Sequence, residues 1–301
     1  MKRWLSVLLT LCLCVGLMLP AAAADTEDVT VPTDYWTDEG NYKEPSINAE
    51  TRTVSITSAA ELAWVAYRCM QGTTFAEYTI LLENDIDLSG HLWMPIGGRD
   101  KDGNGGNQAT AFSGTFDGQG HRIYGMVCSD TDNMFKNYTA LFGVLLDSKI
   151  RNLSVDGNVT AYANASILVG SLGTYGTSSV VLNCNVSGTI NAFVKNSVGA
   201  LIGSAYCGTI YNCSTNCIIR TNNSQYRGAL LGGFNSTLVT VINCCWNAET
   251  IEQPIGDNFV NCYAIPANNT VNYADKLNEV MIEGAAKWVM GSDGYPILGN
   301  L

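Results

Sequence analysis

A phrase that returns along the second half of the chain is the strongest constraint on its fold. Five six-residue copies align on a shared asparagine, and the intervals between these asparagines are 31, 29, 31 and 18 residues. The five are Asn152, Asn183, Asn212, Asn243 and Asn261. A second phrase, of apolar residues followed by glycine, returns alongside them and ends at Gly143, Gly170, Gly203 and Gly232. A period of this size is typical of a solenoid.

The residues after each asparagine alternate between apolar and polar. Leu153 and Val155 would face one way, and Ser154 and Asp156 the other. A period of two predicts strands, and the lack of a 3.6-residue period argues against a helical solenoid. One repeat has too few apolar groups to offset the ordering of its backbone, roughly 1 to 2 kcal/mol per residue, so the repeats must stack. The sequence therefore predicts an all-β fold, a parallel β-helix.

Stacking makes a specific prediction for the asparagines. Equivalent residues of successive coils lie about 4.8 Å apart, so like residues contact like. Asparagine tolerates the left-handed backbone of a sharp bend, and its amide can bond the amide of the next coil. We therefore expect Asn152, Asn183, Asn212 and Asn243 to form a single column.

Composition divides the chain into five stretches. Residues 1–24 are predicted to be an export signal, because Lys2 and Arg3 precede an apolar run that is too short for a confident membrane span and ends in alanines before Asp25. Residues 25–50 would form an N-terminal arm, 51–90 a capping strand and helix, 91–270 the β-helix repeats and 271–301 a small C-terminal cap. We expect an exported chain, secreted or on the extracellular surface, with no membrane insertion after signal cleavage.

Both ends of the solenoid are expected to carry closing elements. Ser58-Ala59-Ala60-Glu61 is a capping box, and it predicts a short amphipathic helix that ends near Gly72. This helix would plug the first coil, whose apolar core and strand edges are otherwise open. Towards the other end, residues 276–282 are weakly helical and residues 288–298, broken by Asp293-Gly294, predict a closing hairpin.

The charge of the chain limits its partners. Removal of Lys2 and Arg3 takes the formal charge from −11 to −13. A strongly acidic protein repels nucleic acid and anionic membranes, so neither is expected as a partner.

Nine cysteines follow the predicted signal. An exported protein favours disulfides, and cysteines stacked in successive coils would have suitable Cα separations. Their odd number, and Leu153 at the corresponding position of the first copy, favour buried free thiols instead. The nine are Cys69, Cys128, Cys184, Cys207, Cys213, Cys217, Cys244, Cys245 and Cys262.

Several blocks, in order, resemble bacterial surface and secreted proteins that carry the GLUG motif, across roughly residues 54–298 as judged by the repeat rule. The resemblance implies a right-handed parallel β-helix of the pectate-lyase-like superfold, serving in adhesion or binding. The blocks are Ala60-Glu61-Leu62-Ala63, Asp85-Ile86-Asp87-Leu88, Trp93 with Pro95-Ile96-Gly97, residues 112–121, Leu141-Phe142-Gly143, Gly203, the Asn-Cys ladder and Gly294-Tyr295-Pro296.

The chain departs from some relatives of this kind. Similar repeats precede the protease domain of zinc immunoglobulin A1 proteases, which need a His-Glu-x-x-His helix. Here His91 and His121 are the two histidines, and they stand in different segments. No cell-wall sorting tail is recognised either, so permanent surface attachment is not expected.

One loop has the beginnings of a calcium site. Asp100, Asp102 and Asn104 supply oxygen ligands at alternate positions, with Gly105 sixth, as in the first half of an EF-hand loop. The twelfth position is Ala111, where a bidentate glutamate is wanted. The alternative is a solvent-exposed Asp/Asn/Gly turn, and calcium is the one cofactor we consider.

An enzyme on this scaffold would need carboxylates that share a groove. Asp85, Asp87 and Asp117, with Arg122, are the best candidates for a lyase or hydrolase site. They also have a structural interpretation: Asp85 and Asp87 would alternate on the outer face of a strand, and Asp117 would bond the backbone of a glycine turn.

The sequence thus favours a secreted or surface-associated, non-enzymatic β-helix module that binds glycan, or a host or bacterial surface protein, along its polar Asn/Ser/Thr flank. A polysaccharide lyase or glycoside hydrolase on the same scaffold is the first alternative. A structural spacer is the second.

Overall fold

The computed structural model describes residues 32–131, 138–193, 197–222, 226–256, 262–267, 272–280, 282 and 284–299, without the side chains of 234–237 and 262–267. The predicted signal of residues 1–24 and Asn261 lie outside the described residues. The described residues belong to the compact unit Pro32–Leu301.

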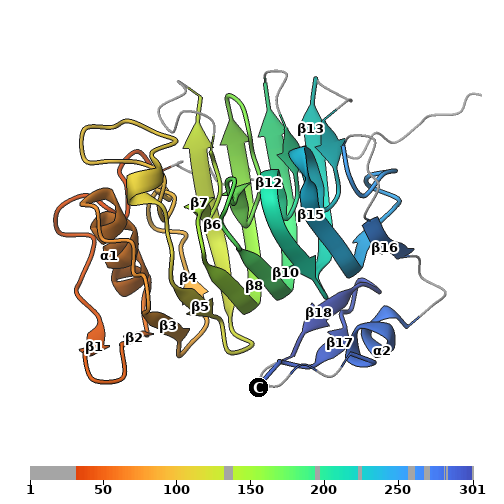
Figure 1. Ribbon diagram of the computed structural model, residues 1–301, viewed down its shortest axis with the longest axis horizontal. Coiled ribbons are helices and arrows are strands. Elements are labelled where there is room, and N and C mark those ends of the chain that lie inside the picture. The colour runs from red at the N-terminus through yellow and green to blue at the C-terminus, as the bar shows by residue number, and fades with distance from the viewer. Residues whose placement is uncertain are drawn as a thin grey trace, which may run out of the picture. The chain divides into compact units, whose positions relative to one another are not determined.

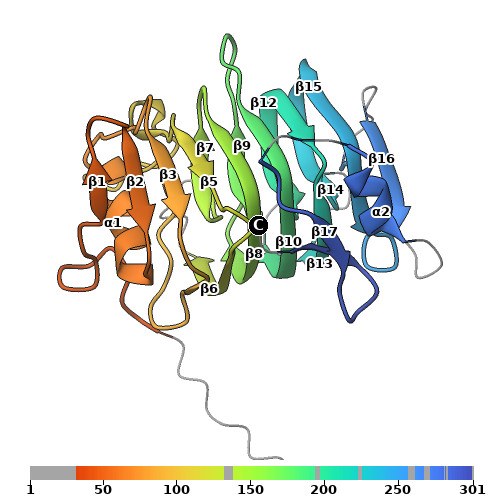
Figure 2. The ribbon, with the colours of Figure 1, turned by 90° about the horizontal axis from the view of Figure 1, so that it is seen from below.

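Parallel pairing between distant strands defines the architecture. The first row of the main sheet has the order β2-β3-β5-β8-β10-β13-β15, and a second row continues β15-β12-β9-β7. Neighbours within a row come from successive coils, as Figures 1 and 2 show. The fold is the predicted parallel β-helix, because each coil returns to pair with the one before it. The first row comprises β2 (Thr53–Ile56), β3 (Thr79–Leu82), β5 (Thr115–Asp117), β8 (Lys149–Ala161), β10 (Val180–Ala192), β13 (Ser214–Thr221) and β15 (Leu231–Asn247).

The remaining strands complete the coils and their edges. β4 pairs with β6, β6 pairs with β8, and a small sheet joins β11 to β14. At the first coil β1 pairs antiparallel with β2, while β16 pairs parallel with β15. These strands are β1 (Ser46–Asn48), β4 (Ile86–Asp87), β6 (Arg122–Asp130), β7 (Phe142–Leu145), β9 (Val169–Leu172), β11 (Val198–Gly199), β12 (Ile202–Tyr211), β14 (Arg227–Gly228) and β16 (Cys262–Ala267).

The predicted asparagine column is present. Asn152, Asn183, Asn212 and Asn243 all have left-handed backbones, with φ of 54°, 53°, 54° and 50°. Each Nδ2 donates to the Oδ1 of the preceding asparagine, at 2.9, 2.9 and 2.7 Å, and Asn152 donates to Asp117 Oδ1 at 3.0 Å. The Asn212 amide meets opposing demands: in this orientation it continues the column, whereas the reversed amide would bond Leu277 O and Trp288 Nε1 and face like ends of the neighbouring amides. We call these four residues the Asn column.

One position beyond the column, the side chains turn inward. Leu153, Cys184 and Cys213 stack in register, and the backbone N–H of Cys213 donates to Cys244 Sγ at 3.4 Å. The eight cysteines whose side chains are described are all buried with free thiols. Cysteine here packs as a small hydrophobe, in the place that leucine takes in the first copy.

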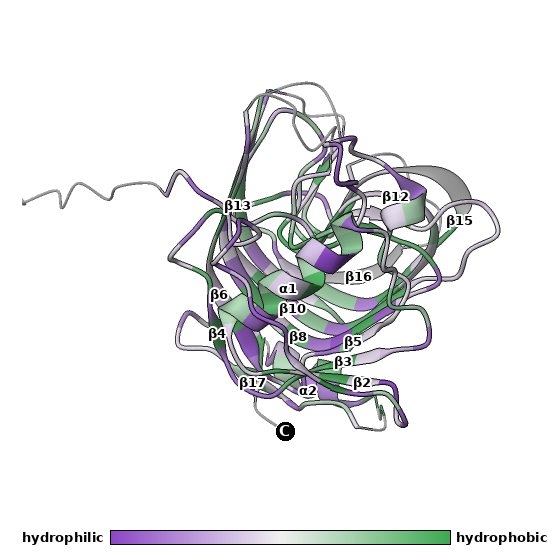
Figure 3. Ribbon diagram, turned by 90° about the vertical axis from the view of Figure 1, so that its left-hand side faces the viewer, coloured by the Kyte–Doolittle hydropathy of each residue, from purple (hydrophilic) through white to green (hydrophobic). Residues whose placement is uncertain are grey.

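A helix covers the first coil, as the capping box predicts. Helix α1 (Ala59–Met70) begins at Ser58, whose Oγ accepts from the Glu61 N–H. Gly72, at φ +91°, lies just beyond its end. Leu62, Val65 and Cys69 are fully buried on its inner face. Figure 3 shows α1 lying across the end of the solenoid, so the helix shields the core from solvent.

The C-terminal segment forms a hairpin as predicted, but it lies along the side of the coils (Figures 1 and 2). It contains α2 (Tyr273–Asn278), which ends four residues before the predicted limit of 282, and the antiparallel strands β17 (Trp288–Met290) and β18 (Pro296–Leu298). We call residues 272–299 the C-terminal strap. Under it Asn152, Asn183 and Asn212 are almost fully buried. This part of the polar flank, expected to be open, is therefore covered by the chain itself.

Candidate functional site

Outward-facing side chains form polar rows on one face of the coils. Arg122 on β6 pairs with Ser154 on β8, and Ser154 pairs with Asn185 on β10. In the next row, Asp156 pairs with Ser187, and Asp156 Oδ2 accepts from Ser187 Oγ at 2.7 Å. In-register parallel pairing spaces the members of a row by about 4.8 Å. The rows thus offer hydroxyl, amide and charged groups at a regular spacing.

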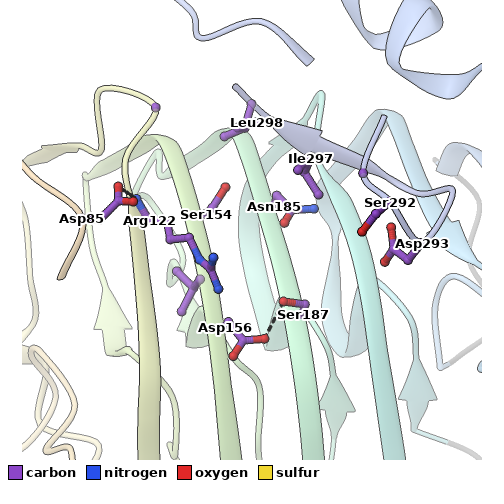
Figure 4. Close-up of a pocket in the computed structure, with 13 residues that line it drawn as sticks. Asp85, Arg122, Ser154, Asp156, Asn185, Ser187, Ser292, Asp293, Ile297 and Leu298 are labelled. Carbon is purple, nitrogen blue, oxygen red and sulfur yellow. Dashed lines mark hydrogen bonds between the residues drawn. The ribbon is translucent and has the colours of Figure 1, made fainter. Parts of the chain in front are cut away.

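The β17–β18 hairpin faces these rows and creates a groove of about 380 Å³, which we call the hairpin groove (Figure 4). Asp293 is held in its wall, because Oδ2 accepts from Asn216 Nδ2 at 2.7 Å and Oδ1 accepts from the Tyr295 N–H at 3.1 Å. Ile297, 40% exposed, adds an apolar surface beside it. The groove is lined by Asp85, Gly120, Arg122, Ser154, Val155, Asp156, Asn185, Ser187, Gly291, Ser292, Asp293, Ile297 and Leu298.

The hairpin groove carries more negative than positive side chains. Asp85, Asp156 and Asp293 contribute three carboxylates, and Arg122 contributes one guanidinium. The Arg122 guanidinium carbon lies 5.0 Å from the centre of the Tyr124 ring, a cation–π contact that orients it. The groove therefore has a net negative charge and favours neutral or cationic ligands over acidic ones.

The structure brings together two of the four residues considered for catalysis. Asp85 and Arg122 line the hairpin groove. Asp85 Oδ1 accepts from the Arg122 backbone N–H at 3.0 Å and lies 3.2 Å from His121 Nδ1. Asp87 Oδ1 instead accepts from the Ser89 N–H at 3.0 Å. Asp87 is thus occupied by its own turn, outside the groove lining.

Asp117 lies elsewhere, at the head of the Asn column. It is buried, its Oδ2 lies 2.6 Å from Arg151 Nη2, and its Oδ1 accepts from the Gln119 N–H at 3.0 Å. Asp117 therefore bonds the backbone of its glycine turn, as the structural interpretation predicts, and its ionic partner is Arg151. Arg122 lies in the hairpin groove instead. An Asp117–Arg122 pairing is not found.

Asp156 and Asp293 are groove residues that the sequence reasoning did not select. Asp156 stands at an outward position of an alternating strand, which is the one signal that could have pointed to it. Asp293 stands in a hairpin turn far along the chain, and no local pattern places that turn beside β10.

The predicted calcium loop is organised around Asp100. Its Oδ1 accepts from the N–H groups of Asp102 and Asn104 at 3.0 and 2.8 Å, and its Oδ2 accepts from Asn104 Nδ2 and Asn107 Nδ2, both at 3.1 Å. These bonds, led by the Asn104 N–H, hold the pKa of Asp100 below its usual value. Asp102 Oδ1 lies 2.8 Å from Lys101 Nζ. The carboxylate oxygens of Asp100 and Asp102 therefore face hydrogen-bond donors of the loop itself.

Two further properties concern only the described residues. Among them, no three His, Cys, Asp or Glu side chains converge so as to hold a metal ion. None of the helices in the described part combines the length and apolar character that a membrane crossing requires.

Comparisons with known proteins support the fold and do not assign a family. No family model matches the chain, so the GLUG assignment stays a prediction. A stretch of 102 residues, 32% of the chain, is 36% identical to the "Putative Gly-rich membrane protein" of Evansella cellulosilytica, of whose length the chain spans about 10%. The crystal structure of a "putative immunoglobulin A1 protease" from Bacteroides ovatus superposes with a TM-score of 0.54 and 16% identity, over 89% of this chain and 97% of that one. At this identity the likeness shows a shared β-helix fold alone.

Proposed function

We propose that this protein is a secreted or surface-associated β-helix module that binds a neutral or amino-sugar glycan in the hairpin groove. The polar rows facing an apolar hairpin residue across an open groove carry the proposal. Sugars present hydroxyls at short, regular intervals together with apolar C–H faces, and the groove offers partners for both. Its excess of carboxylates over guanidinium disfavours uronic and sialic acids.

The carboxylates of the groove support an enzyme as the second candidate. A glycosidase needs one carboxyl group in apolar surroundings to act as general acid. The Asp85 side chain is 51% exposed, and each groove carboxylate already accepts a hydrogen bond from the protein. Binding therefore comes first, because the carboxylates are held as fixed acceptors.

A glycan array probed with residues 25–301 tests the proposal. We expect retention of neutral or amino-sugar oligosaccharides, weakened by about tenfold or more in Arg122→Gln and in Asp156→Asn, since a hydrogen bond to a charged group contributes about 1.5 to 3 kcal/mol. Asn158→Ala is the matched control, because Asn158 is exposed on the same strand outside the groove lining.

Three results would contradict glycan binding in the hairpin groove. If no glycan on the array is bound, the structural spacer becomes the favoured function. Binding that neither groove variant weakens would place the ligand elsewhere. Release of reducing ends from a polysaccharide, abolished in Asp156→Asn, would establish the enzyme instead.

A further inference from the structure

The Asn column carries hydrogen-bonding capacity that the coils do not use. A primary amide has two N–H donors and two oxygen lone pairs, and the column uses one of each per residue. The second Asn183 N–H donates to Ala286 O at 3.0 Å, and its second lone pair accepts from Trp288 Nε1 at 2.7 Å. Asn152 donates likewise to Gly284 O at 2.9 Å. Asn152 and Asn183 thus offer partners in successive coils to an extended main chain, at Gly284 and Ala286.

The strap that takes up these partners has a small core of its own. Trp288, Leu277 and five other strap residues cluster around Cys245, apart from the main core of the coils. Small peripheral clusters open at a lower free energy than the main core. The Tyr295 hydroxyl is buried without a hydrogen-bond partner among the described residues, which further disfavours docking. The strap is therefore the part of this unit expected to open before the coils do.

We propose that the Asn column is a receptor for an extended polypeptide, that the C-terminal strap occupies it within the same chain, and that the strap of a second copy can take its place. A second copy brings the same carbonyl groups at Gly284 and Ala286 and the same indole. The contacts with the Asn column are then unchanged, because both straps carry the same groups.

Exchange has a consequence for the hairpin groove. Asp293 and Ile297 belong to the strap, so an exchanged strap completes the groove of its partner. The proposal itself goes beyond glycan binding, because the Asn column does not line that groove and its contacts need no glycan.

A cleavable chain tests the proposal. A protease site inserted between Ala267 and Asn272 of the mature protein allows the strap to be separated without removal of any residue. Fluorescent synthetic peptide 272–299 is then added, and its anisotropy and native mass spectra are recorded. We expect saturable binding of one peptide per chain, displacement of the original strap, and an unchanged far-ultraviolet circular dichroism spectrum of the coils.

Two peptide variants define the contact. Trp288→Phe keeps the apolar ring and removes the N–H bond to Asn183, so binding should weaken about five- to tenfold. Val289→Thr alters a side chain that is 46% exposed on the outward side of the hairpin, and it should bind like the unmodified peptide.

Failure of the labelled peptide to bind the cut protein would overturn the proposal. So would exchange that occurs only when the coils unfold. Equal weakening by Trp288→Phe and Val289→Thr would show non-specific adhesion in place of recognition by the Asn column.

Discussion

Each residue of the Asn column meets two demands at once. Its backbone is left-handed, with φ between 50° and 54°, a region that costs most L-residues roughly 1 to 2 kcal/mol. Its amide bonds one coil to the next. Glycine satisfies the first demand and not the second, and most other residues satisfy neither. This explains why asparagine returns at the bend of every complete repeat.

Substitution at Asn183 separates the two contributions. We expect Asn183→Ala to lower the free energy of unfolding by about 3 to 5 kcal/mol, because it removes several buried hydrogen bonds and strains the backbone. Asn183→Gly should cost about 1 kcal/mol less, because it relieves the strain alone. Urea unfolding measures both.

Asn158, exposed on the neighbouring strand, gives the control. Asn158→Ala should change the free energy of unfolding by less than about 0.5 kcal/mol. If Asn183→Ala and Asn183→Gly were equal, the left-handed backbone would not be a determinant of this position.

At the scale of elements, the same chain uses its acids in different ways according to the segment that carries them. Asp117 ends β5 and anchors the Asn column, whereas Asp156 faces outward from β8 into the hairpin groove. Asp100 closes a loop on itself. A count of acidic residues therefore says little about function until the face of each element is known.

The loop around Asp100 provides an element-scale test of the calcium prediction. Asp100, whose pKa is lowered by hydrogen bonds led by the Asn104 N–H, would supply one carboxylate and Asp102 the second. If calcium displaces these internal donors, isothermal titration should show sub-millimolar Ca²⁺ binding that Asp102→Ala removes. A titration without heat would contradict the prediction and leave an Asp100-centred turn.

At the scale of the molecule, burial of thiols along the stack couples stability to pH. Burial raises the pKa of the Cys245 thiol to about 12. It also raises the pKa of five other buried cysteine thiols above the usual value. In the unfolded chain a cysteine thiol has a pKa of about 8.5. Below that pH the thiols are protonated in both the folded and the unfolded state, so they do not make stability depend on pH. At higher pH only the unfolded thiols ionise. The other five are Cys69, Cys128, Cys213, Cys217 and Cys244.

We therefore expect the free energy of unfolding to be flat from about pH 7 to about pH 8 and to fall above it, by about 1.4 kcal/mol per pH unit for each buried thiol. Urea unfolding across this range measures the slope. Cys213→Ala should reduce it by the contribution of one thiol. An unchanged slope in that variant would show that other groups cause the dependence.

The repeat, the parallel stacking, the Asn column, the plugging helix and the C-terminal hairpin could all be predicted from the order of the residues. These follow from local rules, namely a period of two, a left-handed asparagine and a capping box, and stacking multiplies each rule coil by coil. The position of the strap could not be predicted and is known from the folded chain alone. Its contacts join residues as far apart as Asn152 and Gly284, 132 positions along the chain. A spare amide N–H can bond water or any carbonyl equally well, so no local pattern shows that the strap covers the column and builds the second wall of the groove.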